Sequence, residues 1–178
     1  MKILAFAGSN STVSINKKLV TFASTFFPDD EVEILDLNDF EMPIYKREIE
    51  LEKGIPQKAL DFAAKIDECD MILLSTPENN GNFPAVFKNL MDWISRMKER
   101  LIFNGKPMFL MATSDGKRGG TSVLEIAEKR FPFDGAKILE IFSLPKFSEY
   151  FDAEKGIVNE EKLEEFKEKV QKVKLKFS

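Results

Sequence analysis

Short apolar runs alternate along the chain with longer amphipathic stretches, and this alternation constrains the fold more than any other feature. Three runs are almost unbroken, as in parallel strands covered on both faces: "KILAFA" (2–7), "MILLS" (71–75) and "PMFLMA" (107–112). The runs "VEILDL" (32–37) and "KILEIF" (137–142) each carry an interior glutamate, which edge strands tolerate best. The pattern predicts an α/β protein with these last two strands at the rims of its sheet.

Segments of helix length, each with an apolar face, separate the strands. The predicted helices cover residues 16–27, 56–68, 84–97, 121–130 and 159–176. Right-handed crossovers then give a flavodoxin-like three-layer sandwich with a five-stranded parallel sheet of order 2-1-3-4-5. Residues 51–56 are expected to form a loop before the second helix. No linker or repeat interrupts the pattern, so we expect a single domain over residues 1–178.

Composition narrows the chemistry that is available. A net charge of −4 without a basic patch argues against nucleic-acid partners. The sequence contains no 18-residue apolar run and no leader-like start, so we expect no membrane partner and a cytoplasmic location. The chain has no histidine and one cysteine, Cys69, which excludes an intrachain disulfide and histidine-based catalysis or zinc binding. Cys69 is interpreted as a packed thiol, and no metal site is expected. An enzyme with this composition needs carboxylates or a cofactor.

Three polar loops follow the first, third and fourth strands: "GSNSTVSIN" (8–16), "TPENNGNFP" (76–84) and "TSDGKRGG" (113–120). They should meet at the carboxyl edge of the sheet, beside the switch point where ligands bind in such folds. The first loop ends where a helix begins, so its N–H groups and hydroxyls suit a phosphate. The alternative is that Ser14 only caps that helix within a polar turn. Amides in the second loop and glycines in the third suit a flat heteroaromatic ring, or else form a turn and a flexible connection.

These loops resemble those of the NADPH-dependent FMN reductases, a flavodoxin-like family with quinone-, azo- and chromate-reducing members. "GSNSTVSIN" is similar to the family's GSxRxxSxN, and "TPENNGNFPAVFKNLMDW" to its TPEYNxSxPxxLKNxxDW. "TSDGKRGG" resembles the glycine-rich third loop of the family. The first loop is neither a Walker A sequence nor a GxGxxG dinucleotide fingerprint.

The resemblance implies an FMN-dependent oxidoreductase that passes a hydride from NADPH or NADH to a small acceptor: a quinone, an azo compound, a metal oxyanion or free flavin. The cofactor carries the chemistry, so no catalytic side chain is implied. The first loop would hold the phosphate, the second would line the ribityl chain and ring, and the third would close over the other side of the ring. The implied cofactor-binding residues are Ser9, Ser11, Ser14, Ile15, Asn16, Pro77, Glu78, Asn79, Asn80, Gly81, Ser114, Asp115, Gly116 and Gly119.

Two positions depart from the family pattern. Ser11 stands where relatives have an arginine, and Asn79 where they have a tyrosine. Loss of a charge-assisted hydrogen bond to the phosphate would weaken FMN binding about ten- to a hundredfold. Lys17 and Lys18 are the nearest cations that can replace the arginine, provided that a side chain turns back to the loop.

The predicted helix 84–97 carries two apolar stripes, one through Leu90 and Trp93 and one through Phe87 and Met91. One stripe must face the sheet, so the other is expected to face a second subunit. With the resemblance, this predicts a homodimer or tetramer through residues 84–97. Two alternative functions stay open: a flavodoxin-like electron carrier without a pyridine-nucleotide site, and a binding protein of the same fold without a cofactor.

Overall fold

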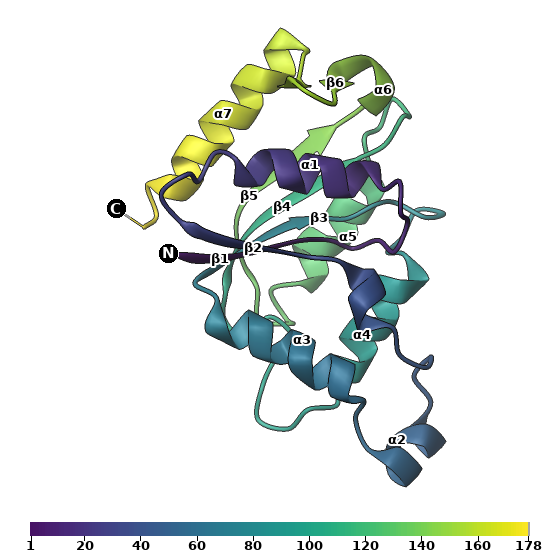
Figure 1. Cartoon of the computed structure of the whole chain (residues 1–178). Helices are drawn as coiled ribbons and strands as arrows, with labels where there is room; N and C mark the ends of the chain where they lie inside the picture. The colour runs from purple at the N-terminus through teal and green to yellow at the C-terminus, as the bar shows by residue number, and fades with distance from the viewer. Residues whose placement is uncertain (178) are drawn as a thin grey trace.

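A five-stranded sheet lies at the centre of the computed structural model, which describes residues 1–177 (Figure 1). All neighbouring strands run parallel, in the order β2-β1-β3-β4-β5. The strands are β1 (Lys2–Ala7), β2 (Glu31–Leu35), β3 (Met71–Ser75), β4 (Pro107–Thr113) and β5 (Lys137–Leu144). The predicted fold class, strand order and edge strands are therefore confirmed.

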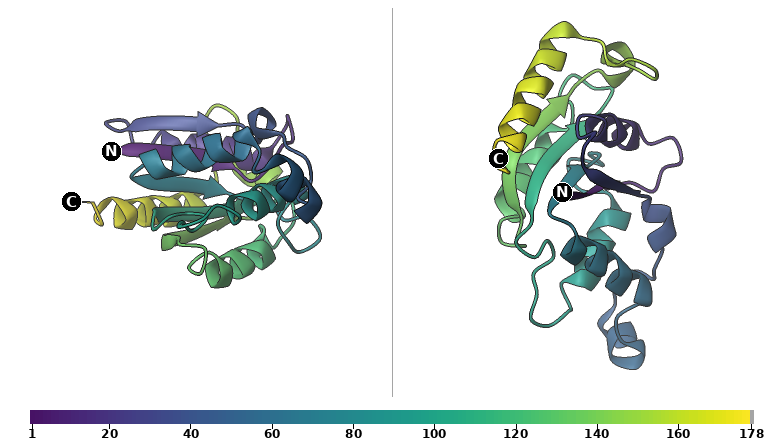
Figure 2. Two further views of the ribbon diagram at one scale, coloured as in Figure 1. Left: turned by 90° about the horizontal axis from the view of Figure 1, so that it is seen from below. Right: turned by 60° about the vertical axis from the view of Figure 1, so that its left-hand side comes forward.

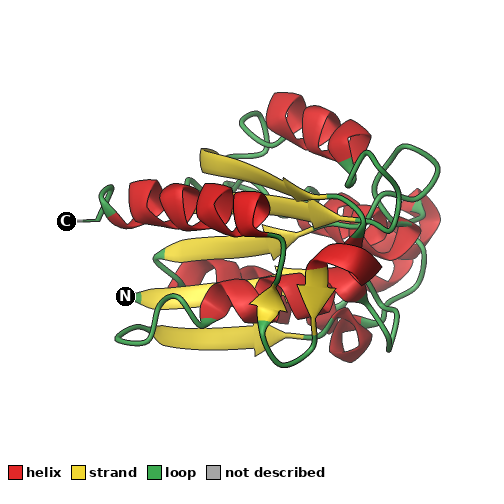
Figure 3. Cartoon of the chain, turned by 90° about the horizontal axis from the view of Figure 1, so that it is seen from above, coloured by secondary structure: helices red, strands yellow, loops and turns green. Residues whose placement is uncertain are grey.

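Helices cover both faces of the sheet, as the amphipathic segments predict. On one face lie α1 (Ile15–Ser24) and α7 (Glu160–Lys174), and on the other α3 (Gln57–Glu68), α4 (Ala85–Ile94) and α5 (Thr121–Arg130) (Figures 2 and 3). Phe166 of α7 and Phe62 of α3, 0% and 1% exposed, belong to the cores on opposite faces. No helix within residues 1–177 has both the length and the apolar composition needed to cross a membrane.

Short elements that the sequence did not predict lie outside the central sheet. They are the 3-10 helix η1 (Leu37–Phe40), α2 (Arg47–Lys53), α6 (Phe147–Tyr150), and the hairpin of β6 (Phe151–Asp152) and β7 (Gly156–Ile157). Helix α2 takes up half of the loop predicted at residues 51–56, which corrects that expectation. It ends at Gly54, whose φ of 75° closes the last turn, and it lies apart from the sheet (Figures 1 and 2).

Residues 41–46, called the strap below, cross over α4. The indole N–H of Trp93 donates to the carbonyl oxygen of Pro43 at 2.7 Å, and Tyr45 N donates to Asn89 Oδ1 at 2.7 Å. The Tyr45 ring meets Trp93 edge-on, with 5.0 Å between ring centroids. Leu90 and Trp93 are consequently 3% and 0% exposed. Leu90 and Trp93 of the second stripe are thus covered by the chain itself, whereas Val86 is only partly buried, and the expected subunit contact through this helix stays a prediction.

The lone cysteine lies at the end of α3. Cys69 is 4% exposed, and its thiol donates to the carbonyl oxygen of Ile66 at 3.3 Å. Burial raises the pKa of the Cys69 thiol to about 11. The interpretation as a packed, unreactive thiol is confirmed.

Candidate functional site

A cavity of about 270 Å³ opens at the carboxyl edge of the sheet, between the loops that follow β1 and β3. Its lining residues are Ser9, Asn10, Ser11, Val13, Ser14, Ile15, Asn16, Pro77, Asn79 and Pro84. The two loops therefore meet where the sequence predicted. Glu78, Asn80, Gly81 and the predicted residues of the third loop do not line this cavity.

The start of α1 supplies hydrogen-bond donors to the cavity. Ser14 is the N-cap, and its Oγ accepts from Lys17 N at 3.2 Å, which leaves its hydroxyl proton available. The N–H groups of Ile15 and Asn16 have no hydrogen-bond partner within residues 1–177. Free N–H groups at the positive end of a helix, beside neutral hydroxyls, are donors that fit a phosphate.

The side chain of Asn16, in contrast, makes hydrogen bonds within the protein. Its Nδ2 donates to Thr113 O at 3.0 Å, and its Oδ1 accepts from Thr113 N at 3.0 Å and Ser75 Oγ at 2.8 Å. Asn16 is 1% exposed, so the amide is a buried link between the ends of β3 and β4. Of the groups of Asn16, the N–H is the donor that remains for a ligand. That Asn16 takes part in phosphate binding stays a prediction, which its N–H can meet and its buried side chain cannot.

No cation replaces the family's arginine at the cavity. Lys17 Nζ hydrogen-bonds to Asp36 beyond the end of β2, and this bond lowers the pKa of the Asp36 carboxyl. Lys18 lines a separate groove of about 490 Å³ between α1 and the β6–β7 hairpin. The residues that line the 270 Å³ cavity include no lysine or arginine. A phosphate bound there would be held by neutral groups.

The second loop is a tight hairpin. Asn79 N donates to Asn82 O at 2.9 Å, and Asn82 N donates back to Asn79 O at 3.1 Å. The two central residues, Asn80 and Gly81, have φ values of 52° and 77°, as in a type I′ turn. Asparagine and glycine are the residue types that tolerate these angles, which explains this part of the motif.

Glu78 connects the second loop to the third. Its Oε2 accepts from Ser122 N at 3.0 Å and from Val123 N at 3.3 Å, both in the first turn of α5. Its Oε1 lies 3.5 Å from Arg118 Nη2, and the side chain is 18% exposed. The carboxylate is therefore engaged with α5 and does not line the cavity.

The third loop packs against the residues that follow β5. Asp115 Oδ1 accepts from Ser148 Oγ at 2.6 Å and from Ser148 N at 3.0 Å, and these bonds lower the pKa of the Asp115 carboxyl. The carbonyl oxygens of Ser114 and Gly116 each accept a backbone N–H at 3.1 Å, from Phe147 and Lys146 respectively. The predicted residues of this loop are thus placed beside the second loop through Glu78.

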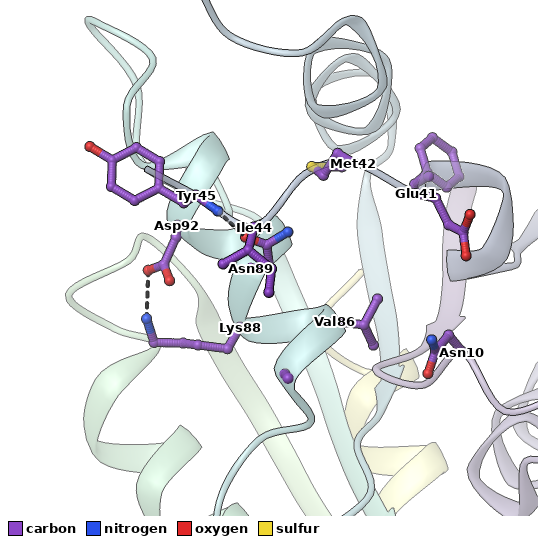
Figure 4. Close-up of a pocket in the computed structure, with 11 residues that line it drawn as sticks. Asn10, Glu41, Met42, Ile44, Tyr45, Val86, Lys88, Asn89 and Asp92 are labelled. Atoms are coloured by element: carbon purple, nitrogen blue, oxygen red, sulfur yellow. Dashed lines mark hydrogen bonds and ion pairs between the residues drawn. The ribbon is translucent and has the colours of Figure 1, made fainter. Parts of the chain in front are cut away.

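A larger cavity of about 720 Å³ adjoins the first at Asn10 and lies between the strap and α4 (Figure 4). Its walls carry apolar side chains such as Met42 and Val86. They also carry an ion pair, in which Lys88 Nζ lies 2.5 Å from Asp92 Oδ1. Sequence reasoning missed this wall, because the strap has no hydrophobic periodicity and α2 was not predicted. It also missed Asn10, Val13 and Pro84, which lie inside the quoted loops without a signal of their own.

Comparison with known proteins shows the family and the fold of the chain. The family profile described as NADPH-dependent FMN reductase matches residues 1–147. A 2-hydroxy-1,4-benzoquinone reductase from a Burkholderia species is 32% identical over 67% of this chain, which spans 63% of that protein. An NADPH:quinone oxidoreductase of Arabidopsis thaliana is 27% identical over 94% of this chain and 87% of its own length. The solved structure of the flavoenzyme FerB, an NAD(P)H:(acceptor) oxidoreductase from Paracoccus denitrificans, superposes with a TM-score of 0.77 at 22% identity over 97% of both chains.

Proposed function

The chain belongs to the NADPH-dependent FMN reductase family, and from this premise we propose that it is an FMN-dependent oxidoreductase that uses NADPH or NADH to reduce a small acceptor. The candidate acceptors are a quinone, an azo compound, a metal oxyanion and free flavin. The observation that carries the proposal is the 270 Å³ cavity lined by unpartnered N–H groups at the start of α1. When bound, the flavin supplies the redox chemistry, since it can take a hydride from a reduced nicotinamide and pass the electrons on.

The first loop binds the phosphate in this proposal. The N–H groups of Ile15 and Asn16 donate to it, and the hydroxyl of Ser14 adds a third donor while its oxygen caps α1. Ser9 and Ser11 use their oxygens to accept backbone N–H groups at 3.2 Å and 3.3 Å, and their hydroxyl protons stay available. The chain thus offers several short neutral donors in one concave loop.

The second and third loops orient the ring. Pro77 and Asn79 line the cavity, and Glu78 between them reaches Arg118 of the third loop and the first turn of α5. Both carboxylates of these loops are engaged within the protein: Glu78 accepts two backbone N–H groups, and Asp115 accepts the N–H and the hydroxyl of Ser148. Their proposed task is to hold the loops, so proton transfer by a side chain has no part in the proposal.

Flavin binding and reduction test the proposal directly. The purified protein, with FMN added where needed, should show the visible bands of bound flavin, and anaerobic mixing with NADPH or NADH should bleach them within seconds. Bound flavin that is not bleached would favour an electron carrier. A melting temperature that saturating FMN leaves unchanged would favour a binding protein without cofactor, since a ligand at 100 times its Kd stabilises by about 2.7 kcal/mol. Rates with a quinone, an azo dye and chromate would then rank the acceptors.

We also propose that the protein acts as a cytoplasmic homodimer, with α4 and the strap at the interface. The larger cavity between these two elements supports this placement, as does Ile44, a strap residue that is 82% exposed. A sedimentation experiment that finds only the monomer at micromolar concentration would contradict the dimer.

A further inference from the structure

Helix α5 begins without a capping side chain of its own. Its N-cap is Gly120, whose φ of 81° suits glycine, and a Cβ at this position would lie 2.8 Å from the Cβ of Ala112. The first N–H groups of a helix need an acceptor from outside the helix. Since Gly120 has no side chain, that acceptor has to come from another segment.

Glu78 is that acceptor, and it comes from the second loop. One carboxylate oxygen takes the N–H groups of Ser122 and Val123 at 3.0 and 3.3 Å, and the other faces the guanidinium of Arg118 at 3.5 Å. At 18% exposure the carboxylate is largely shielded from water, which strengthens its hydrogen bonds. One side chain therefore fixes the second loop to the end of the third.

The third loop is in turn fixed to the sheet. A Cβ on Gly119 would lie 2.4 Å from Ser143 Oγ and 2.7 Å from Pro145 N, so the backbone passes directly over the end of β5. Ser143 Oγ also donates to Gly119 O at 3.0 Å. Because this loop is anchored, the bonds of Glu78 set the position of the second loop relative to the sheet.

We propose that Glu78 is a positioning residue, which holds the second loop at the separation from the third loop that the flavin ring requires. This inference rests on the proposed function. Glu78 acts through the hairpin that follows it, where Asn79 lines the cavity. A second consequence concerns charge: the carboxylate offsets the positive end of α5, so the start of α5 is not open to the phosphate.

The test uses two variants of Glu78 and two flavins. Glu78→Ala removes the acceptor, whereas Glu78→Gln keeps an oxygen that can accept the N–H groups. Glu125→Ala is the matched control, because Glu125 is an exposed residue of the same helix whose side chain makes no hydrogen bond or ion pair within residues 1–177. Binding of FMN and of riboflavin, which lacks the phosphate, is measured by quenching of flavin fluorescence. Hydrogen exchange of the Ser122 and Val123 amides in the flavin-free proteins reports on the bonds themselves.

Glu78→Ala should weaken FMN and riboflavin by the same factor, up to about tenfold, because the second loop, once released from α5, occupies its binding position for only part of the time in the flavin-free protein. The Ser122 and Val123 amides should exchange faster in this variant. Glu78→Gln should restore most of the affinity, and Glu125→Ala should bind both flavins like the wild type.

Three results would overturn the inference. Equal flavin binding by Glu78→Ala and the wild type would make Glu78 a structural residue only, and a loss confined to FMN would place it with the phosphate. A Gln variant as weak as the Ala variant would mean that charge matters and that N–H acceptance does not. A wild type that binds neither flavin defeats the proposed function itself and is thereby distinguishable from all three.

Discussion

Replacing Ser11 with arginine is expected to tighten FMN binding, because the cavity at the start of α1 contains no cation. The FMN phosphate carries a charge of about −1.5 to −2 at neutral pH. Lys17, the cation nearest to the first loop in the sequence, hydrogen-bonds to Asp36, so only neutral donors remain to bind the phosphate. Ser11 is exposed and lines the cavity, which leaves room for a longer side chain.

The size of the effect follows from the bonds involved. A hydrogen bond to a charged group contributes about 1.5–3 kcal/mol, which corresponds to about a ten- to hundredfold lower Kd. The substitution also removes the bond from Val13 N to Ser11 Oγ, 3.3 Å long. That bond exists with and without a ligand, so its loss lowers the stability of the fold, by up to about 1 kcal/mol, and leaves the affinity unchanged.

Fluorescence titration of the flavin-free protein measures the effect. Ser11→Arg should bind FMN more tightly and riboflavin unchanged, and the gain should shrink at high salt because exposed charges are screened. Thr12→Arg is the matched control: it adds the same charge one residue further on, at a side chain that lines the groove on the other side of α1. The reasoning is refuted if a folded Ser11→Arg protein binds FMN like the wild type, if riboflavin tightens equally, or if Thr12→Arg gives the same gain.

Three further substitutions test the framework around the site. Gly119→Ala should lower the unfolding free energy by about 2–4 kcal/mol in denaturant, because Gly119 has a positive φ and an added Cβ would collide with Ser143. Gly116→Ala is the control: its Cβ would meet nothing closer than 3.6 Å, so the unfolding free energy should change by less than about 0.5 kcal/mol. The folded pKa of Cys69, about 11, lies above its usual value of 9.0, so the thiol favours folding below pH 9 and loses this contribution as the pH rises to 11. The difference in unfolding free energy between wild type and Cys69→Ala should shrink over that interval, and a constant difference would contradict burial as the cause. Trp93→Phe removes the N–H that donates to the strap at 2.7 Å, so it should cost about 1–2 kcal/mol and expose the strap to limited proteolysis; cleavage at the wild-type rate would argue against the strap being held this way.

The strand order of the sheet could be predicted because the residues of each strand differ between the centre and the edges: central strands are almost entirely apolar, and edge strands contain a glutamate. The glutamates that marked two runs as edge strands lie at the rims and reach partners on neighbouring helices: Glu33 pairs with Lys65 at 2.7 Å, and Glu140 with Lys169 at 3.4 Å. A central strand has helices on both faces and neighbours on both sides, so the same charge would be buried there without water.

The strap could not be predicted, so the sequence did not show that Leu90 and Trp93 of α4 are covered by the chain itself. Hydrophobic periodicity identifies a face that is buried but does not tell what buries it. Here the cover is an irregular segment, held by a hydrogen bond of 2.7 Å from Trp93 and by two hydrogen bonds of Asn89. Side chains that bond to the backbone of a distant segment leave no pattern in the sequence, so a stripe covered within the chain and a stripe awaiting a subunit look alike.

The first two loops meet at one edge of the sheet as predicted, yet the tasks of their side chains had to come from the structure. A serine, an asparagine or an acid is as well suited to hold a helix end or a strand end as to hold a ligand. Four predicted ligands are used in this way: Ser14 caps α1, Asn16 joins β3 to β4, Glu78 caps α5, and Asp115 accepts the Ser148 hydroxyl and N–H. The donors left over at the first loop are the N–H groups of Ile15 and Asn16, which side-chain substitutions do not remove, and the hydroxyls of Ser9, Ser11 and Ser14. A change at Ser11 should therefore adjust phosphate affinity by a factor, whereas loss of the buried Asn16 amide should change the shape of the loop and with it the site as a whole.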